Sequence, residues 1–173
     1  ELRKRQQAQV EQHTESGAGI DKGVAAALRS ADKSYTIQDC FTGMASLPSN
    51  GNFTIIECDP PYGIDLNEQK AGSESVTSTV TGYKEVERSD YPAFLDKLTS
   101  EMYRVAGKDC WLVFWYGPTW HQAVLDSLRR AGWAVDEIPG IWVKPNGQTL
   151  QPALYFARCS EPFFLCRTGR PVM

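Results

Sequence analysis

The sequence predicts an α/β fold in which strands alternate with helices around a parallel or mixed sheet. Two runs, Phe53–Cys58 and Cys110–Tyr116, are short and rich in β-branched or aromatic residues, as is typical of buried strands. Between them, residues 90–105 repeat apolar side chains at helical spacing. A strand, a helix and a second strand in this order form the unit from which parallel sheets are built. We expect the second run, which is apolar throughout, to be a central strand covered on both faces.

The other elements follow from local patterns and turn residues. Residues 64–89 are polar and show no clean period, and their place suits a lid over a substrate. In chain order, the remaining predictions are a strand at 35–37, a helix at 41–47, a turn at 48–51, a helix at 119–131 that ends before Gly132, and strands at 133–138, 141–143 and 161–167.

Composition limits the class of protein. The chain has 173 residues, enough for one core, and a hydrophobic content of 42%, which is that of a globular domain. Its net charge is −3, so any nucleic-acid-binding surface would have to be local. Residues 1–33 are polar and predict a helical or linker segment ahead of a folded domain at 34–173. No signal peptide or membrane-spanning run is present, and we expect a cytoplasmic protein with no membrane partner.

The cysteines and most aromatic residues predict burial. The five cysteines form no Cys-x-x-Cys pair and have no histidine beside them, which favours reduced, buried thiols over a metal site. The five tryptophans fit the strand and helix periods and are interpreted mostly as core residues. Tyr116, at the end of the second apolar run, is the further aromatic residue expected beside a pocket.

The tetrapeptide Asp59-Pro60-Pro61-Tyr62 directly follows the strand predicted at 53–58. Neither proline has a backbone N–H, so the turn offers carbonyl oxygens and the Asp59 carboxylate, all of them hydrogen-bond acceptors. An exocyclic amine on adenine or cytosine carries two N–H donors that would fit such acceptors. Tyr62 would stack on the base, a contact worth roughly 1–3 kcal/mol. These residues favour a site that holds a planar base by its amine, and a strand-to-loop turn without chemistry is the alternative.

Asp-Pro-Pro-Tyr after a hydrophobic strand resembles the catalytic motif of the amino-group DNA methyltransferases. These enzymes transfer a methyl group from S-adenosylmethionine to adenine N6 or cytosine N4. The resemblance covers residues 34–170 and includes Trp142-Val143-Lys144 and the Arg158-to-Glu161 step. It implies a Rossmann-like methyltransferase sheet, double-stranded DNA as partner and a prokaryotic or phage origin, as in restriction-modification. The catalytic residues that it implies are Asp59, Pro60, Pro61 and Tyr62.

The resemblance also implies roles around the motif. Asp39, at the end of the strand predicted at 35–37, is expected to bind the cofactor together with Cys40 and Asp59, and a helix cap is the alternative for Asp39. Aspartate rather than serine at position 59 favours adenine N6 over cytosine N4. Glu161 could equally pair with Arg158. The cations expected to contact DNA phosphates, or else to be solvated surface charges, are Lys144, Arg158, Arg167 and Arg170.

One motif of such enzymes does not occur in the sequence. A glycine-rich turn of the Asp-x-Phe-x-Gly-x-Gly kind lets the backbone approach the methionine part of the cofactor. In members with permuted motif order this turn follows the catalytic half, so we expect the chain to be truncated, its partner being a C-terminal half of the same protein. A homodimer is left open. The alternatives are N4-cytosine methylation, methylation of RNA or of protein amides, and a fragment that binds nucleic acid or a partner without methylating.

Overall fold

The computed structural model describes residues 35–64, 86–148, 153 and 156–172. The chain divides into two compact units, Glu1–Asp39 and Cys40–Met173, and every helix and strand described below belongs to the second. The boundary predicted between residues 33 and 34 stays a prediction, as does the lid predicted at 64–89, most of which lies outside the described residues.

The strands of the described residues form one mixed sheet. Strand β1 (Phe53–Cys58) pairs in parallel with β2 (Ala106–Trp115), and β2 pairs antiparallel with β5 (Arg158–Arg167). The other edge of β5 is shared by β3 (Ala134–Val135) and β4 (Gly140–Gln148), both antiparallel to it. The α/β class and the mixed sheet predicted from the sequence are confirmed.

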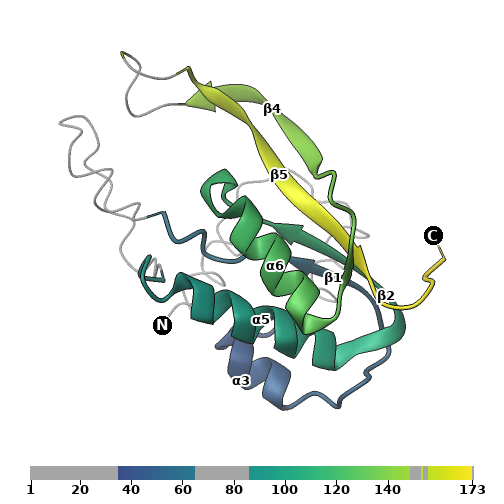
Figure 1. Ribbon diagram of the computed structural model, residues 1–173. Helices are drawn as coiled ribbons and strands as arrows, with labels where there is room; N and C mark the ends of the chain where they lie inside the picture. Colours follow the sequence, from purple (N-terminus) through teal and green to yellow (C-terminus); the bar gives the residue numbers. More distant parts are fainter. Residues whose placement is uncertain (1–34, 65–85, 149–152, 154–155, 173) are drawn as a thin grey trace, which may run out of the picture. The chain divides into compact units, whose positions relative to one another are not determined.

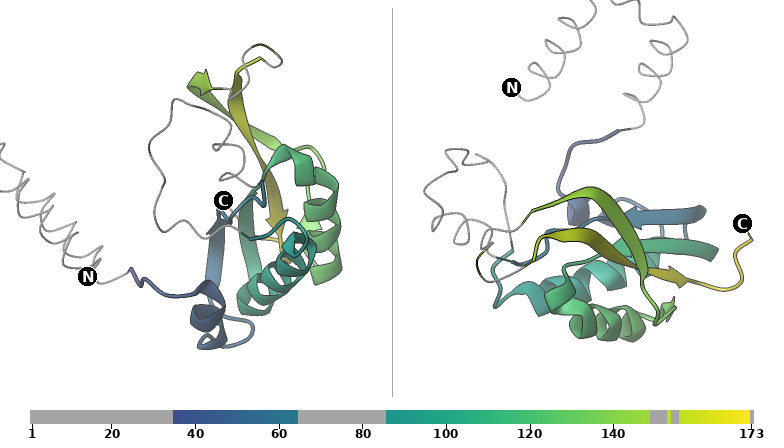
Figure 2. Two further views of the ribbon diagram at one scale, coloured as in Figure 1. Left: turned by 90° about the vertical axis from the view of Figure 1, so that its left-hand side faces the viewer. Right: turned by 90° about the horizontal axis from the view of Figure 1, so that it is seen from above.

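The helices α5 (Tyr91–Val105) and α6 (His121–Ala131) lie side by side on one face of the sheet (Figures 1 and 2). A short helix, α3 (Cys40–Ala45), packs against α5, and a 3₁₀ turn at Pro118–Trp120 leads into α6. Helix α6 ends, as predicted, at Gly132, whose φ of 107° is the left-handed conformation that glycine adopts without strain. None of the described helices is long and apolar enough to cross a membrane.

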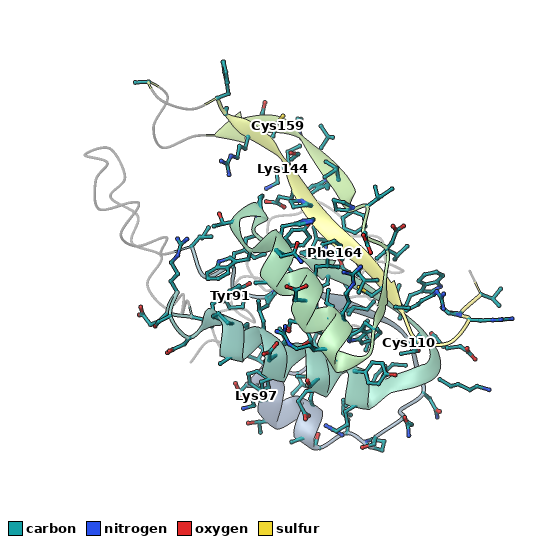
Figure 3. The ribbon with its side chains drawn as sticks, in the orientation of Figure 1. Tyr91, Lys97, Cys110, Lys144, Cys159 and Phe164 are labelled. Carbon is teal, nitrogen blue, oxygen red and sulfur yellow. The ribbon has the colours of Figure 1, made fainter. Side chains whose placement is uncertain are left out.

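The core fills the space between the sheet and these two helices. Side chains alternate along a strand, so Cys110, Leu112 and Phe114 of β2 all face the helices and are completely buried. The antiparallel register adds Cys166 opposite Leu112 and Phe164 opposite Phe114, and Figure 3 shows Phe164 where β5 and α6 meet. The helices contribute the buried side chains of Leu95, Leu98, Met102, Val124, Leu125 and Leu128.

The second face of the sheet corrects the prediction that β2 is covered on both sides. Trp111, Val113 and Trp115 alternate with the buried residues of β2 and are only half-buried. Ile55, opposite Trp111 on β1, is 63% exposed. The apolar run of β2 therefore does not require helices on both faces of the sheet. Among the described residues, α5 and α6 both cover the same face, and no helix covers the second one. Aromatic side chains on this second face are available to line a pocket.

Several strand predictions change in extent, and β2 and β5 begin earlier than predicted, at Ala106 and Arg158. The strand predicted at 35–37 was wrong, because this segment has no regular structure and its Tyr35 side chain is 77% exposed. Within 133–138 only β3 is extended, since Trp133 turns into the core and donates its indole N–H to the Thr99 carbonyl. β4 continues through Pro145, because its register with β5 shifts between Val143 and Gln148 and a bulge needs no ladder bond from proline.

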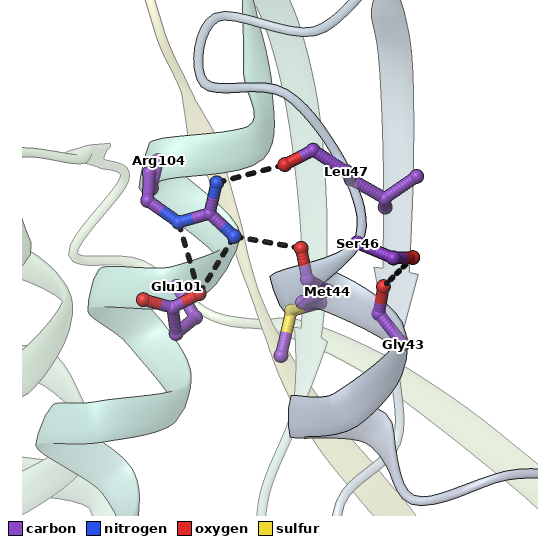
Figure 4. A network of polar contacts seen from close by, with 6 residues as sticks. All are labelled: Gly43, Met44, Ser46, Leu47, Glu101 and Arg104. Carbon is purple, nitrogen blue, oxygen red and sulfur yellow. Dashed lines mark hydrogen bonds and ion pairs between the residues drawn. The ribbon is translucent and has the colours of Figure 1, made fainter.

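Arg104 ties α5 to the chain that leads into β1 (Figure 4). Its guanidinium donates to the carbonyl oxygens of Met44 and Leu47, at 2.7 and 3.0 Å, and also to the Glu101 carboxylate. The last carbonyls of a helix have no partner within the helix, and a cation placed there both caps them and matches the helix dipole. Arg104 therefore fixes the end of α3 and the start of the turn before β1.

We expect Arg104→Met to lower the free energy of unfolding by about 1.5–3 kcal/mol. The substitution removes the charged donor and leaves its acceptors without their hydrogen bonds. Arg129→Met is a matched control, since Arg129 pairs with Glu137 on the surface and such pairs contribute about 0–1 kcal/mol. Urea unfolding followed by circular dichroism gives both values. Equal losses in the two variants would contradict a special role for Arg104.

Candidate active site

The motif predicted to be catalytic forms a closed loop at the carboxyl end of β1. The Tyr62 hydroxyl donates to Asp59 Oδ1 over 2.8 Å, so a side-chain hydrogen bond bridges the two prolines. Pro60 is buried, Pro61 and Tyr62 are half-buried, and Asp59 is exposed. The rigid loop thus presents a carboxylate to solvent and holds one of its oxygens in place.

Contacts on the inner side of the loop fix its path. Gly63 has a φ of 58°, and a Cβ atom there would lie 2.7 Å from the Tyr91 ring at the start of α5. The Trp120 indole N–H donates to the Gly63 carbonyl at 3.2 Å. Only glycine combines this backbone conformation with such a close approach. Contacts with Tyr91 and Trp120 therefore fix the position of the loop that carries the Asp59 carboxylate.

The Tyr62 hydroxyl keeps its proton across the neutral range. Burial, and then the hydrogen bond to Asp59, raise the pKa of the Tyr62 hydroxyl well above its ordinary value. The phenol therefore remains a donor to the carboxylate. Tyr62 orients Asp59 in addition to offering an aromatic face.

An open pocket of about 460 Å³ lies beside Asp59, on the sheet face without described helices. Parallel pairing brings the carboxyl ends of β1 and β2 to the same edge, and the register of β4 with β5 sets Trp142 opposite Glu161. The pocket therefore collects residues from four strands or strand ends. Among the residues that the structure describes, its lining consists of Glu57, Asp59, Trp115, Trp142 and Glu161.

The pocket is polar at its rim and aromatic on one wall. The Trp115 indole N–H donates to Glu57 Oε1 at 3.2 Å, and the Trp115 and Trp142 rings meet edge to face with centroids 6.0 Å apart. Lys144 donates to Glu161, and its ammonium group lies 5.3 Å from the centre of the Trp142 ring. Three carboxylates and one paired ammonium group make this a site for hydrogen-bond donors rather than for phosphate.

The structure does not gather the four cations predicted to contact DNA. Lys144 pairs with Glu161, which is also a different partner for Glu161 from the Arg158 considered on the sequence. Arg158 and Arg167 stand at opposite ends of the ten-residue β5, about 30 Å apart by the rise of a strand. Arg170 follows β5, and its backbone N–H donates to Asp109. Their contact with phosphate stays a prediction.

The three residues predicted for the cofactor do not all line the pocket. Asp39 belongs to the first compact unit, and the strand that was expected to carry it is not formed. Cys40 is the exposed first residue of α3, in the second unit. Asp59 alone of the three lines the pocket. The roles of Asp39 and Cys40 stay predictions.

Sequence reasoning placed the wrong aromatic residue of β2 at the site. Tyr116 is 1% exposed, stacks on Phe164 at 4.6 Å and bonds to His121 Nδ1, all on the helical side. Trp115, one position earlier, lines the pocket with Trp142, which is 50% exposed. These two were therefore wrongly interpreted as core, whereas Trp133, at 3% exposure, is core as predicted.

Two signals could have found the missed residues. Glu57 is the one charge inside the run Phe53–Cys58, and an isolated carboxylate in a predicted strand often marks a site. Trp115 ends the next strand of a parallel pair, and such ends meet at one edge of the sheet.

The described cysteines differ in burial, which predicts their reactivity. Burial raises the pKa of the Cys166 thiol to about 12. The pKa of Cys58 is also raised to about 12, and burial is the largest of its causes. At pH 8 a thiol of this pKa is deprotonated only to about 10⁻⁴. Iodoacetamide should therefore label the exposed Cys159 well before either of them, as peptide mass spectrometry would show. Labelling of Cys166 at the rate of Cys159 in folded protein would contradict the burial.

No protein-family model matches the sequence, and no curated protein sequence matches it. Among solved structures, a protein from Thermus thermophilus assigned as a DNA modification methylase matches with a TM-score of 0.51 and 19% identity, over 79% of this chain and 54% of that one. Its complex with S-adenosyl-L-methionine matches with a TM-score of 0.47 and 17% identity, over 79% and 54% of the two chains.

The M1.HpyAVI–SAM complex matches with a TM-score of 0.47 and 13% identity, over 78% of this chain and 55% of that one. The chain thus spans about half the length of the structures it matches. Over this span, the match at a TM-score of 0.51 shows that the chain shares the fold of the T. thermophilus protein.

Proposed function

We propose that this chain is the catalytic part of a DNA methyltransferase that methylates the exocyclic amine of a flipped base, with adenine N6 as the target. The observation that carries the proposal is the closed loop of Asp59 and Tyr62 at the mouth of an acceptor-rich, aromatic pocket. The fold shared with the T. thermophilus protein supports it. None of the described helices covers this face of the sheet, which gives an extruded base a route to the loop.

The residues of the loop act by holding the amine. With Oδ1 engaged by Tyr62, Asp59 Oδ2 has no hydrogen-bond partner among the described residues and can accept one amine hydrogen. The Pro60 carbonyl is the proposed acceptor for the second. Two acceptors favour a pyramidal nitrogen, whose lone pair is then available for attack. Holding the base and placing charge supply the catalysis, and extruding the base costs a few kcal/mol.

The acidic pocket also fits the proposed cofactor. When bound, S-adenosylmethionine supplies a methyl group on a positively charged sulfur, and carboxylates with indole faces are the groups that favour such a cation. We propose Asp59 of the pocket, and also Asp39 and Cys40, as cofactor-binding residues. The methylated amine then loses one proton to solvent, with Asp59 accepting its hydrogen bond throughout.

The proposal includes a partner at the edge of the sheet. Among the described residues β1 pairs only with β2, and Phe53 and Ile55 on β1 are 40% and 63% exposed. We place the expected C-terminal half, with its glycine-rich turn, along this edge. Such an addition would cover apolar surface and satisfy the unpaired backbone of β1.

A non-catalytic fragment that binds nucleic acid is the second candidate. It is favoured by the lack of an Asp-x-Phe-x-Gly-x-Gly motif in the sequence and by the match to only about half of the related structures. Against it, Lys144 beside the pocket is already paired with Glu161.

Transfer of tritium from methyl-labelled S-adenosylmethionine to duplex DNA tests the proposal. The assay uses this chain, alone and within any longer natural chain that contains it, and the DNA is digested to nucleosides. We expect the label in N6-methyldeoxyadenosine. Label in N4-methyldeoxycytidine would show that the target is cytosine. If both forms of the chain bind DNA but neither transfers label to it, the non-catalytic candidate is favoured.

A further inference from the structure

The wall of the pocket opposite Asp59 is a corner made of two indole rings. Trp115 and Trp142 meet at 75° with centroids 6.0 Å apart, and we call this pair the indole corner. Phe163 packs on Trp115 at 4.8 Å. Gly140, opposite Phe163 in the register, leaves room for that ring, since a Cβ atom there would lie 2.2 Å from it. The corner is therefore packed firmly on the sheet.

Glu57 fixes the orientation of the first ring. It is paired with Val113, two residues before Trp115, and therefore lies on the same sheet face as Trp115; its Oε1 accepts the indole N–H at 3.2 Å. An indole has a single donor, so this bond determines which edge of the ring faces the pocket. Glu57 also lines the pocket itself, and its Oε2 has no hydrogen-bond partner among the described residues.

The second ring is held by an ion pair. Lys144 lies 5.3 Å from the centre of the Trp142 ring and donates to Glu161 on the neighbouring strand. Both side chains are about one-third exposed. Lys144 and Trp115 thus both donate to carboxylates of the protein. The groups that remain for a ligand at the rim of the pocket are therefore hydrogen-bond acceptors.

We propose that Glu57 is a positioning and specificity-determining residue of this pocket. It holds Trp115 in the indole corner, and the negative charge of its second oxygen, in the same pocket as Asp59, adds to the preference for a flat heterocycle that carries an amine over one that carries a carbonyl at the same place. The ligand class rests on the proposed function. Neither the catalytic motif nor the implied cofactor residues include Glu57.

Adenosine and inosine are the matched probes, because they differ by an amine and a carbonyl at position 6 of the purine. Indole ¹H–¹⁵N resonances of the five tryptophans, assigned by substitution, report the Trp115 hydrogen bond directly, and titration gives the dissociation constants. The variants are Glu57→Leu, which removes the acceptor, and Glu57→Gln, which keeps an acceptor oxygen but adds donors. Glu137→Leu removes a carboxylate that pairs with Arg129 on the surface and serves as control.

In the wild-type chain we expect adenosine to shift the Trp115 and Trp142 resonances and to bind about tenfold more tightly than inosine. Glu57→Leu should move the Trp115 resonance without ligand and weaken adenosine by about five- to tenfold. Glu57→Gln should restore the Trp115 resonance but reduce the preference for adenosine to about two- to threefold, because the amide can donate to the carbonyl of inosine while Asp59 still accepts from the amine of adenosine. Glu137→Leu should match the wild type.

Two results would overturn the inference. If Glu57→Leu leaves the Trp115 resonance unmoved, or Glu57→Gln fails to restore it, Glu57 does not position the ring. If adenosine binds the wild type but the preference over inosine is as large in both variants as in the wild type, Glu57 does not contribute to specificity, although the proposed function stands. If the indole resonances of the wild-type chain respond to neither nucleoside, the pocket does not bind a base, and the proposed function, which depends on that binding, is contradicted.

Discussion

Asp59→Ala should reduce methyl transfer to DNA by at least about 10²- to 10³-fold, the usual cost of removing a preorganised polar group at a reacting centre. The carboxylate is the exposed acceptor of the closed loop, and Tyr62 holds one of its oxygens at 2.8 Å. Without it the amine loses the hydrogen bond that directs its lone pair. Initial rates of tritium transfer in the longest chain that shows activity measure the effect.

Two companion variants separate chemistry from folding. Asp59→Asn keeps the size of the side chain and one carbonyl acceptor, and we expect it to retain more activity than Asp59→Ala. Asp126→Ala removes a carboxylate on α6 that accepts only from Gln122 in the described residues, and it should leave the rate unchanged. Normal methylation by Asp59→Ala would refute the catalytic assignment of the motif.

Phe164→Ala is expected to lower the free energy of unfolding by about 3–5 kcal/mol, a large part of the 5–15 kcal/mol that holds a typical domain. Phe164 is completely buried, stacks on Tyr116 at 4.6 Å and contacts the His121 ring at 5.1 Å. Its removal leaves a cavity between β5 and α6 that rigid neighbours fill poorly. Chemical denaturation followed by tryptophan fluorescence measures the change.

The same substitution at an exposed position gives the control. Phe156 is 98% exposed, so Phe156→Ala should change the free energy of unfolding by no more than about 0.5 kcal/mol. If the two variants unfold at the same denaturant concentration, the result contradicts the burial of Phe164 between β5 and α6.

Elements that depend on one local pattern were predictable from the sequence. β1 begins and ends at the predicted residues, and α5 begins one residue later than predicted. Gly132 ends α6 because only a residue without a side chain enters the left-handed conformation freely. Where the pattern needed a partner, prediction failed: residues 35–37 have strand-forming side chains but no strand pairs with them in the described residues.

The candidate site divides in the same way. The sequence by itself determined the chemistry of the loop, because two prolines and a carboxylate leave acceptors whatever surrounds them, and it placed the loop after a strand. It could not tell which face of β2 the helices cover. A period of two says that Trp115 and Tyr116 point to opposite sides, but not which side is open.

Only the tertiary structure decided what surrounds the carboxylate. Pairing of β1 with β2 brought Glu57 to Trp115, and pairing of β4 with β5 joined Lys144 to Glu161 beside Trp142. These contacts link residues far apart in the chain, so their geometry follows from strand register and packing rather than from local preference. The sequence therefore determined which carboxylate is the candidate for chemistry in this protein, and the fold decided which side chains form the pocket around it.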